Sequence, residues 1–113
     1  MSSERARARL EDVVVNGDWV AEYLDGITLS RFLTDQMRVD AVERCLQRIT
    51  EAVIQLGEEQ SVQVGLELPW HDLRTLGNRL RHEYRHIDRR IIYGIAINDV
   101  PDLRDAAARA LEA

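Results

Sequence analysis

Residues 30–57 read SRFLTDQMRVDAVERCLQRITEAVIQLG, and this stretch decides the fold. Its apolar residues return every three or four positions, which is the spacing of one face of an α-helix. We expect a helix that is capped by the side chain of Ser30 and ended by Gly57. The predicted buried face consists of Val39, Val42, Cys45, Leu46, Ile49, Ala52, Val53 and Leu56.

Four more helices are predicted around this one. The first runs from Glu4 to about Leu24 and stops at Asp25–Gly26, a helix-ending pair. A short helix opens at Pro69–Trp70 and reaches about residue 76, and a longer helix covers 77–97 with Leu76, Leu80, Tyr84, Ile87, Ile91 and Ile95 as its apolar stripe. A break at Asn98–Asp99 and a proline at 101 precede the last helix, predicted over 102–111.

Residues 58–69 are the exception, because Val62, Val64, Leu66 and Leu68 alternate with polar residues at the period of a strand. No second segment alternates in this way, so we interpret the stretch as an extended connector. The sequence therefore predicts an all-α bundle of four or five helices that forms one domain over residues 1–113.

Composition separates a basic segment from an acidic remainder. The chain has 113 residues, a net charge of −5 and 45% hydrophobic residues, which excludes a disordered chain. Residues 74–90 nevertheless contain six arginines against two carboxylates. Such a patch suits one phosphate-bearing partner, although a solvated helix face remains open.

Other classes of protein are not indicated. The single cysteine, Cys45, sits among apolar residues and is expected to be buried, so no disulfide framework is predicted. Trp19 and Trp70 are expected to be packing residues. No secretion signal and no membrane-spanning run is apparent, so we expect a cytoplasmic protein.

The segment 77–86, GNRLRHEYRH, supports two interpretations. His82, Glu83 and His86 match the pattern H-E-x-x-H, which can place two zinc-binding imidazoles and a glutamate base on one helix face. A third ligand has no recognisable setting, because Ile92 occupies the position where the extended motif has histidine. A zinc hydrolase is therefore a distant alternative.

The second interpretation follows from helical geometry. At about 100° per residue, Asn78, His82, Arg85, His86 and Arg89 fall on one polar stripe, with Arg79 on its flank. An imidazole can move a proton near neutral pH, and guanidinium groups can offset charge that builds on phosphate oxygens. The set suits phosphodiester cleavage with no metal ion and no cofactor.

The same segment resembles the signature helix of HepT-like HEPN proteins, the ribonuclease toxins of toxin–antitoxin pairs. The resemblance is carried by Asn78–Tyr84 and Ile87–Asp88. It extends in order along nearly the whole chain, through Tyr23–Gly26, Phe32–Asp35, Ala41–Val42, Ile49–Ala52, Pro69–Trp70 and Val100–Leu103.

This resemblance implies a HEPN-like bundle that forms a homodimer, with two active sites facing each other across a cleft. It implies that the 2′-hydroxyl of the RNA attacks the adjacent phosphorus, with His82 as the catalytic imidazole and Asn78 as its polar partner. It also implies that Tyr84 is modified with AMP by a cognate minimal nucleotidyltransferase antitoxin. Beside these residues we place Arg79 in the catalytic set and expect Arg81, Arg85 and Arg89 to contact RNA phosphates.

One position departs from the pattern, since Gly77 stands where the family most often has arginine. Arg79 could reach a phosphate from another angle. The alternative to a ribonuclease toxin is therefore a catalytically inactive HEPN protein that binds a nucleotidyltransferase, and under that alternative Gly77→Arg should restore cleavage. Glu51, in the middle of the helix of residues 30–57, is expected to pair with an arginine of the signature helix.

Overall fold

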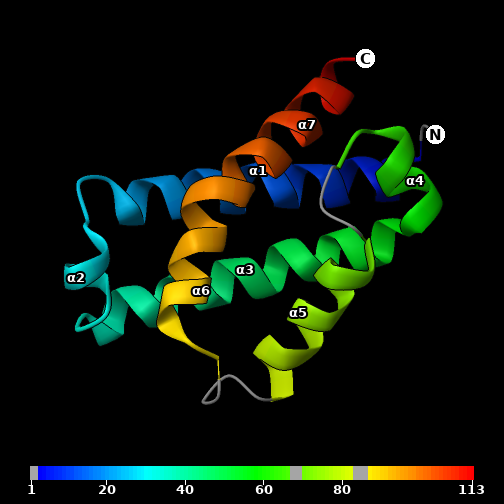
Figure 1. Cartoon of the computed structure of the whole chain (residues 1–113). Helices are drawn as coiled ribbons and strands as arrows, with labels where there is room; N and C mark the ends of the chain where they lie inside the picture. Colours follow the sequence, from blue (N-terminus) through cyan, green and yellow to red (C-terminus); the bar gives the residue numbers. More distant parts are fainter. Residues whose placement is uncertain (1–2, 67–69, 83–86) are drawn as a thin grey trace.

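Two long helices make up the first layer of the molecule. The computed structural model describes residues 3–66, 70–82 and 87–113, with the backbone alone at 70–74. Helix α1, Glu4–Leu24, and helix α3, Gln36–Leu56, lie side by side and run in opposite directions (Figure 1). Ser3 caps α1 by accepting a hydrogen bond from the backbone N–H of Ala6 at 3.0 Å.

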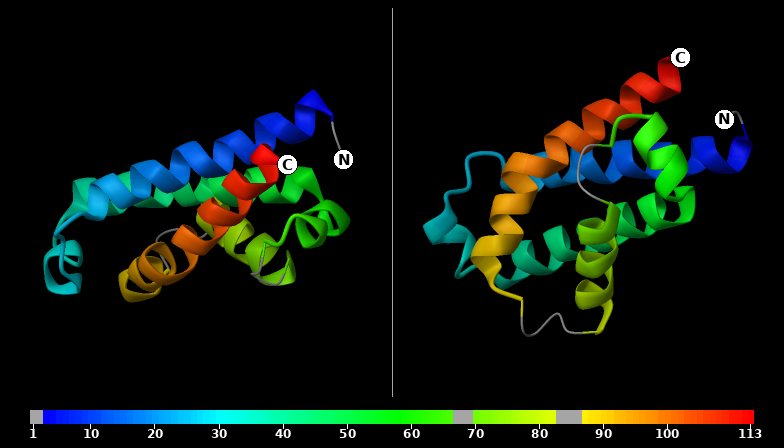
Figure 2. Two further views of the ribbon diagram at one scale, coloured as in Figure 1. Left: turned by 90° about the horizontal axis from the view of Figure 1, so that it is seen from above. Right: turned by 45° about the vertical axis from the view of Figure 1, so that its right-hand side comes forward.

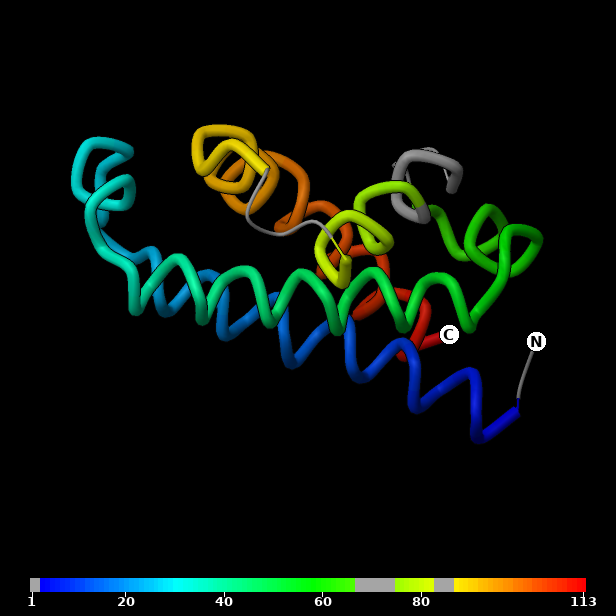
Figure 3. The backbone as a smooth tube through the Cα atoms, turned by 90° about the horizontal axis from the view of Figure 1, so that it is seen from below, coloured from blue at the N-terminus to red at the C-terminus, as the bar shows by residue number. Residues whose placement is uncertain are grey.

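Shorter helices cover one face of this pair and make the second layer (Figure 2). They are α4, Glu58–Gln63, α5, Trp70–His82, α6, Arg89–Gly94, and α7, Val100–Glu112, which continues α6 through a π-helical turn, η2, at Ile95–Asp99. Seen from below, α3 runs along one side while α4, α5 and α6 lie against it (Figure 3). The all-α bundle is confirmed, and no strand occurs within the described ranges.

The start of the central helix differs from the prediction. Ser30 lies inside a separate short helix, α2, Leu29–Phe32, which Thr28 caps. Asp35 caps α3 by accepting from the N–H of Arg38 at 3.1 Å, and its carboxylate also pairs with the Arg38 guanidinium at 2.7 Å. A cap that makes both interactions explains why α3 starts here. The predicted end at Gly57, which has a φ of +92°, is confirmed.

The extended connector predicted for 58–69 is wrong where the structure describes it. Residues 58–63 form α4, with two glutamates in the first turn, where they complement the helix dipole. Val62 is 70% exposed while Ser61 is buried, so the alternating apolar residues of this segment do not form one buried face. Gly65, with a φ of +78°, turns the chain after α4.

The single helix predicted for 77–97 is also wrong. Helix α5 runs through the predicted boundary at 76–77 and ends at His82. Asp88 then adopts an extended conformation and caps α6 through the N–H of Arg90 at 2.9 Å. The new start changes the phase of the apolar face, so Ile92 is buried and Ile91 is 51% exposed. Tyr84, a member of the predicted stripe, lies outside the described residues.

No break occurs at Asn98–Asp99. The turn η2 carries the helix directly into α7, whose first turn contains Pro101, so α7 begins two residues before the predicted start. Tyr93, on α6, donates a hydrogen bond to the carbonyl oxygen of Ile27 at 2.6 Å and packs on Phe32 with ring centroids 5.3 Å apart. These contacts fasten α6 to the segment around α2.

The core lies between the two layers and is almost entirely aliphatic. Cys45 is 1% exposed, as predicted, and burial raises the pKa of its thiol. None of the helices in the described part of the chain is both long and apolar enough to cross a membrane. The largest fully buried side chains are Phe32, Leu10, Leu46, Ile49, Leu80 and Ile92.

Candidate functional site

The last turns of α5 present Asn78 and His82 to solvent. These residues are four apart, so they lie on the same face of the helix one turn apart, and both are exposed. Leu80, on the opposite face, is fully buried. The helical stripe predicted from the sequence is therefore confirmed for the amide and the imidazole.

Arg81 links α5 to α3. Its Nη2 donates to Oδ1 of Asn78 at 2.6 Å, and its Nη1 donates to Oε2 of Glu51 at 2.8 Å. The predicted pairing of Glu51 with an arginine of this helix is thereby confirmed. Because the guanidinium has a partner on each side, its plane is held beside the Asn78 amide. Arg81 directly precedes His82 in the chain.

Gln47 supports the same end of α5. Its Nε2 donates to the carbonyl oxygen of Leu80 at 2.9 Å, within the last turn of α5. The last turn also carries Arg79, Arg81 and His82, and the helix dipole stabilises the positive charges of the two arginines there. Arg79 itself is half-buried.

Gly77 has a packing role that the sequence did not suggest. A Cβ atom on Gly77 would lie 3.0 Å from Oγ1 and 3.1 Å from Cβ of Thr50, and 3.4 Å from Cδ1 of Ile54. The absent side chain therefore allows α5 to approach α3 closely. An arginine at this position would point into α3, so the expectation that Gly77→Arg restores cleavage is not supported by the geometry.

Arg89 is not on the same helix as His82. It is the first residue of α6, and its Nη1 donates to the carbonyl oxygen of Leu33 at 2.9 Å while its Nη2 bonds to Gln36. The structure therefore brings Asn78, Arg81 and His82 together and gives Arg89 a contact with the α2–α3 segment.

Several predicted site residues lie outside the described residues, namely Glu83, Tyr84, Arg85 and His86. The zinc-binding pair His82 and His86 is therefore not placed as a pair. Among the residues that are described, no group of three or more histidine, cysteine, aspartate or glutamate residues could hold a metal ion.

A groove of about 630 Å³ opens between α1, α3 and α5. We name it the arginine groove, and its basic and amide side chains are Arg9, Asn16, Arg44, Gln47, Arg48 and Arg81. Trp19 lies beside it with the Arg48 guanidinium 6.0 Å from the ring centroid. Trp19 is 40% exposed, so its predicted role as a packing residue needs correction.

Sequence reasoning missed this groove because three distant segments build it. A signal was present in α3, where Arg44 and Arg48 are four residues apart on the face opposite the apolar stripe. That signal reads equally as an ordinary solvated helix face. Only the packing of α1 and α5 against α3 gives the two arginines a concave setting.

The chain is similar to proteins that carry ribonuclease names. A Methanocaldococcus jannaschii protein named "Putative RNase" is 33% identical over 102 residues, which cover 90% of this chain and 84% of the relative. A Caldanaerobacter subterraneus protein with the same name is 27% identical and covers 94% of each chain. A Thermococcus cleftensis protein named "Probable ribonuclease HepT" is 27% identical, covering 84% of this chain and 86% of the relative.

No solved structure matches this chain at the significance at which these relatives do. The family profile described as "Ribonuclease HepT-like" matches residues 16–110, a range that begins near the middle of α1 and ends in α7. It includes the whole of α3 and α5, and therefore Asn78, Arg81 and His82. The chain belongs to the HepT-like ribonuclease family.

Proposed function

We propose that this ribonuclease is the toxin of a toxin–antitoxin pair, that it cleaves RNA without a metal ion, and that His82 is its proton-transfer residue. The observation that carries the proposal is the arrangement around Asn78, whose amide oxygen lies 2.6 Å from the Arg81 guanidinium. The residue after Arg81 is His82, whose imidazole is exposed. An imidazole, an amide and guanidinium groups on one helix end suit phosphodiester chemistry.

The proposed reaction uses the nucleophile that RNA itself carries. The imidazole of His82 takes the proton of the 2′-hydroxyl, whose oxygen attacks the adjacent phosphorus. The bond to the 5′ oxygen breaks, that oxygen takes a proton from solvent, and a 2′,3′-cyclic phosphate remains. Arg79 and Arg81 stabilise the negative charge that builds on the phosphate oxygens, and Arg85 and Arg89 are proposed to contact neighbouring phosphates.

The test is cleavage of labelled single-stranded RNA by the purified full chain in the presence of EDTA. We expect His82→Ala to abolish cleavage, with a loss of at least about a hundredfold, the lower range for removing a general acid or base. The matched control is His71→Ala, which removes a histidine to which no role is assigned. Unchanged cleavage by His82→Ala would contradict the proposal, and loss of wild-type cleavage in EDTA would favour the zinc hydrolase.

Arg81 provides a second test of the same site. Replacing its partner by Glu51→Gln leaves the guanidinium in place but weakens its positioning, because the ion pair at 2.8 Å becomes a hydrogen bond to a neutral amide. We expect a smaller loss of cleavage than for Arg81→Gln. The two variants should have similar thermal stability, because the pair is partly exposed to solvent.

We further propose that a cognate nucleotidyltransferase silences the toxin by transferring AMP to Tyr84. The support is a charge argument, since AMP adds a phosphate and bulk two residues after His82, where it would repel and obstruct RNA. We expect a minimal nucleotidyltransferase to be encoded beside this chain, and incubation with ATP and that enzyme should add the mass of one AMP group and reduce cleavage. Tyr84→Phe should prevent both effects.

The active form is proposed to be a homodimer. Ile91, just after the signature segment, is a 51% exposed apolar residue and is the position at which we test this contact.

A catalytically inactive protein that binds the transferase is the second candidate, and the buried Gly77 is the observation that favours it. Intact RNA after incubation with wild-type protein, together with co-purification of the transferase, would select this candidate. Gly77→Arg does not decide between the two, because the added side chain would displace α5 from α3.

A further inference from the structure

We propose that the arginine groove binds the RNA strand that continues from the scissile phosphate, with Arg44 and Arg48 on its phosphates and Trp19 stacked on a base. This inference rests on the proposed function, since it concerns how the substrate of the His82 site is held. Nothing in the family assignment concerns these three residues.

The charge of the groove favours a polyanion. Its lining holds four guanidinium groups against two carboxylates, those of Asp12 and Glu51. Glu51 is paired with Arg81, and Asp12 lies 3.5 Å from Arg9. These pairs leave the remaining two arginines as the source of the positive potential.

Arg44 and Arg48 are the two arginines available to phosphate. Arg44 donates to the neutral amide oxygen of Gln47 at 2.9 Å, and Arg48 lies over the Trp19 ring. Within the described part of the chain, neither makes an ion pair with a carboxylate. They are one turn apart on α3, about 6 Å along its axis, and both are exposed. Two such groups in line can follow a phosphate backbone.

Trp19 supplies the second component of a single-strand site. An aromatic ring beside a basic groove is the arrangement by which proteins bind single-stranded nucleic acid without reading sequence. The ring is 40% exposed, and the guanidinium of Arg48 lies 6.0 Å from its centroid. A base that stacks on the ring would therefore place its own phosphate beside Arg48.

Two buried polar atoms without partners point to a ligand that both donates and accepts. Asn16 is 4% exposed and lines the groove, and its Nδ2 donates to the Asp12 carbonyl oxygen at 2.8 Å. Among the described residues, its Oδ1 and the Nε of Arg9 have no hydrogen-bond partner. Ribose 2′-hydroxyls can donate to an amide oxygen and accept from a guanidinium N–H, and DNA lacks them.

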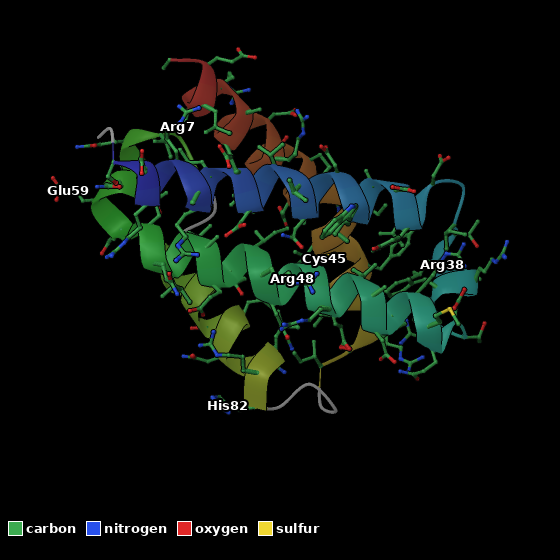
Figure 4. All side chains as sticks on the ribbon, turned by 180° about the vertical axis from the view of Figure 1, so that it is seen from behind. Arg7, Arg38, Cys45, Arg48, Glu59 and His82 are labelled. Carbon is green, nitrogen blue, oxygen red and sulfur yellow. The ribbon has the colours of Figure 1, made fainter. Side chains whose placement is uncertain are left out.

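The groove also lies on the route to the proposed catalytic residue. Arg81 lines it and directly precedes His82. Arg48 and His82 are seen from the same side of the molecule, on the α1–α3 face and at the end of α5 (Figure 4). A strand bound across α3 can thus continue to the imidazole.

The experiment measures binding separately from cleavage. The full chain carrying His82→Ala is titrated into a fluorescein-labelled oligouridine of about 12 nucleotides, within the site sizes of single-strand binding proteins, and anisotropy is followed at several salt concentrations. Arg44→Gln/Arg48→Gln should weaken binding at least about tenfold and reduce the salt slope by about 1.4, which is about 0.7 for each phosphate that is no longer neutralised. Trp19→Ala should weaken binding about tenfold with an unchanged slope.

The matched control is Arg5→Gln/Arg109→Gln, which removes two exposed arginines that do not line the groove. Binding equal to that of this control would overturn the inference. Equal affinity for the corresponding oligodeoxyuridine would contradict the role given to Asn16. Circular dichroism melts confirm that each variant folds.

Three further outcomes separate this inference from its alternatives. If the groove variants dissociate a dimer in analytical ultracentrifugation, the groove is a contact between subunits and the inference fails. If the groove variants bind weakly but the chain with His82 intact cleaves no RNA, the groove inference stands and the proposed function fails. If His82→Ala abolishes cleavage and the groove variants bind normally, the proposed function alone survives.

Discussion

Asp35 shows how one side chain both starts a helix and makes its stability depend on pH. The backbone N–H and the guanidinium of Arg38 hold the pKa of the Asp35 carboxyl below its ordinary value of 3.8. Because the pKa is lower in the folded chain, the carboxylate stabilises the fold above pH 3.8. This contribution is lost as the pH falls through the lowered pKa.

Asp35→Asn isolates the charge, because asparagine caps a helix as well as aspartate does. We expect the variant to melt at a lower temperature than wild type at neutral pH, and the difference to shrink as the pH falls below 3.8 and to vanish below the lowered pKa. Thermal denaturation followed by circular dichroism across this range provides the measurement. Asp35→Ala, which removes the cap as well, should remain less stable than wild type at every pH. A constant difference between Asn and wild type would contradict the argument.

At the scale of residues, the sequence indicated which side chains suit phosphate chemistry, but it did not indicate most of the contacts between side chains of different helices. The shared face of Asn78 and His82 was predicted because helical periodicity places residues four apart together, and Glu51 was expected to pair with an arginine because its neighbours in the helix are apolar. The contacts of Arg89 with Leu33 and Gln36 were not predicted, since they depend on where α6 begins. The need for a glycine at position 77 was also not visible in the sequence, because the space there is limited by the side chain of Thr50 in α3.

Gly17 allows α1 and α7 to pack closely. A Cβ atom there would lie 2.8 Å from Cβ and 2.9 Å from Cγ of Arg104, which are atoms near the backbone and cannot easily move. Arg104 is also fixed by its hydrogen bond to Asp18 at 2.8 Å. This crossing of helices therefore depends on a glycine.

Two alanine substitutions should have opposite effects. Alanine is favoured over glycine within a helix by about 1 kcal/mol. Gly94 is helical, and a Cβ atom added there would meet no other atom within 4 Å, so Gly94→Ala should raise the free energy of unfolding by about that amount. Gly17→Ala should lower it by about 1–3 kcal/mol, because overpacking outweighs the propensity gain. Urea denaturation measures both, and stabilisation by Gly17→Ala would contradict the packing argument.

Element boundaries were the least predictable part of the fold. The long periodic helices α1 and α3 were recognised because each has more than five turns of consistent pattern. The break before α6 was missed because Asp88 caps a new helix within a segment whose composition stays helical. The short helix α4 was missed because a brief apolar alternation resembles a strand by chance.

The whole molecule has two layers, and one face of the α1–α3 layer carries the arginine groove. The fold class was predictable from the sequence, because apolar spacing of three and four extends over most of the chain. The groove was not predictable, since it requires the relative placement of α1, α3 and α5. Shape and electrostatics at this scale follow from packing rather than from any one segment.

The proposed dimer gives a prediction for the whole molecule. One copy has a Cα radius of gyration of 13.6 Å and a mass of 13.0 kDa. Light scattering should give about twice that mass, and X-ray scattering a radius well above this value. Ile91→Glu should produce a monomer, because it places a charge at the position proposed to contact the second copy, just after the signature segment. Val62→Glu, at a residue that is 70% exposed on α4, is the matched control and should leave the mass unchanged.

The π-helical turn η2 is a position at which one residue can be deleted while the buried residues keep their orientation. Ile92, Ala96 and Val100 are each four residues apart and all are buried. In a regular α-helix, residues four apart differ in direction by about 40°, because four residues make slightly more than one turn. The wider π-helical turn at Ile95–Asp99 compensates for this rotation, so the three side chains face the same side. Deleting Asn98, which is exposed, would let the turn close to α geometry with Ile92 and Val100 still about 20° apart. The shortened chain should therefore fold with an intact core, whereas the same deletion within α3 would rotate every later residue by about 100° and expose half of its apolar face.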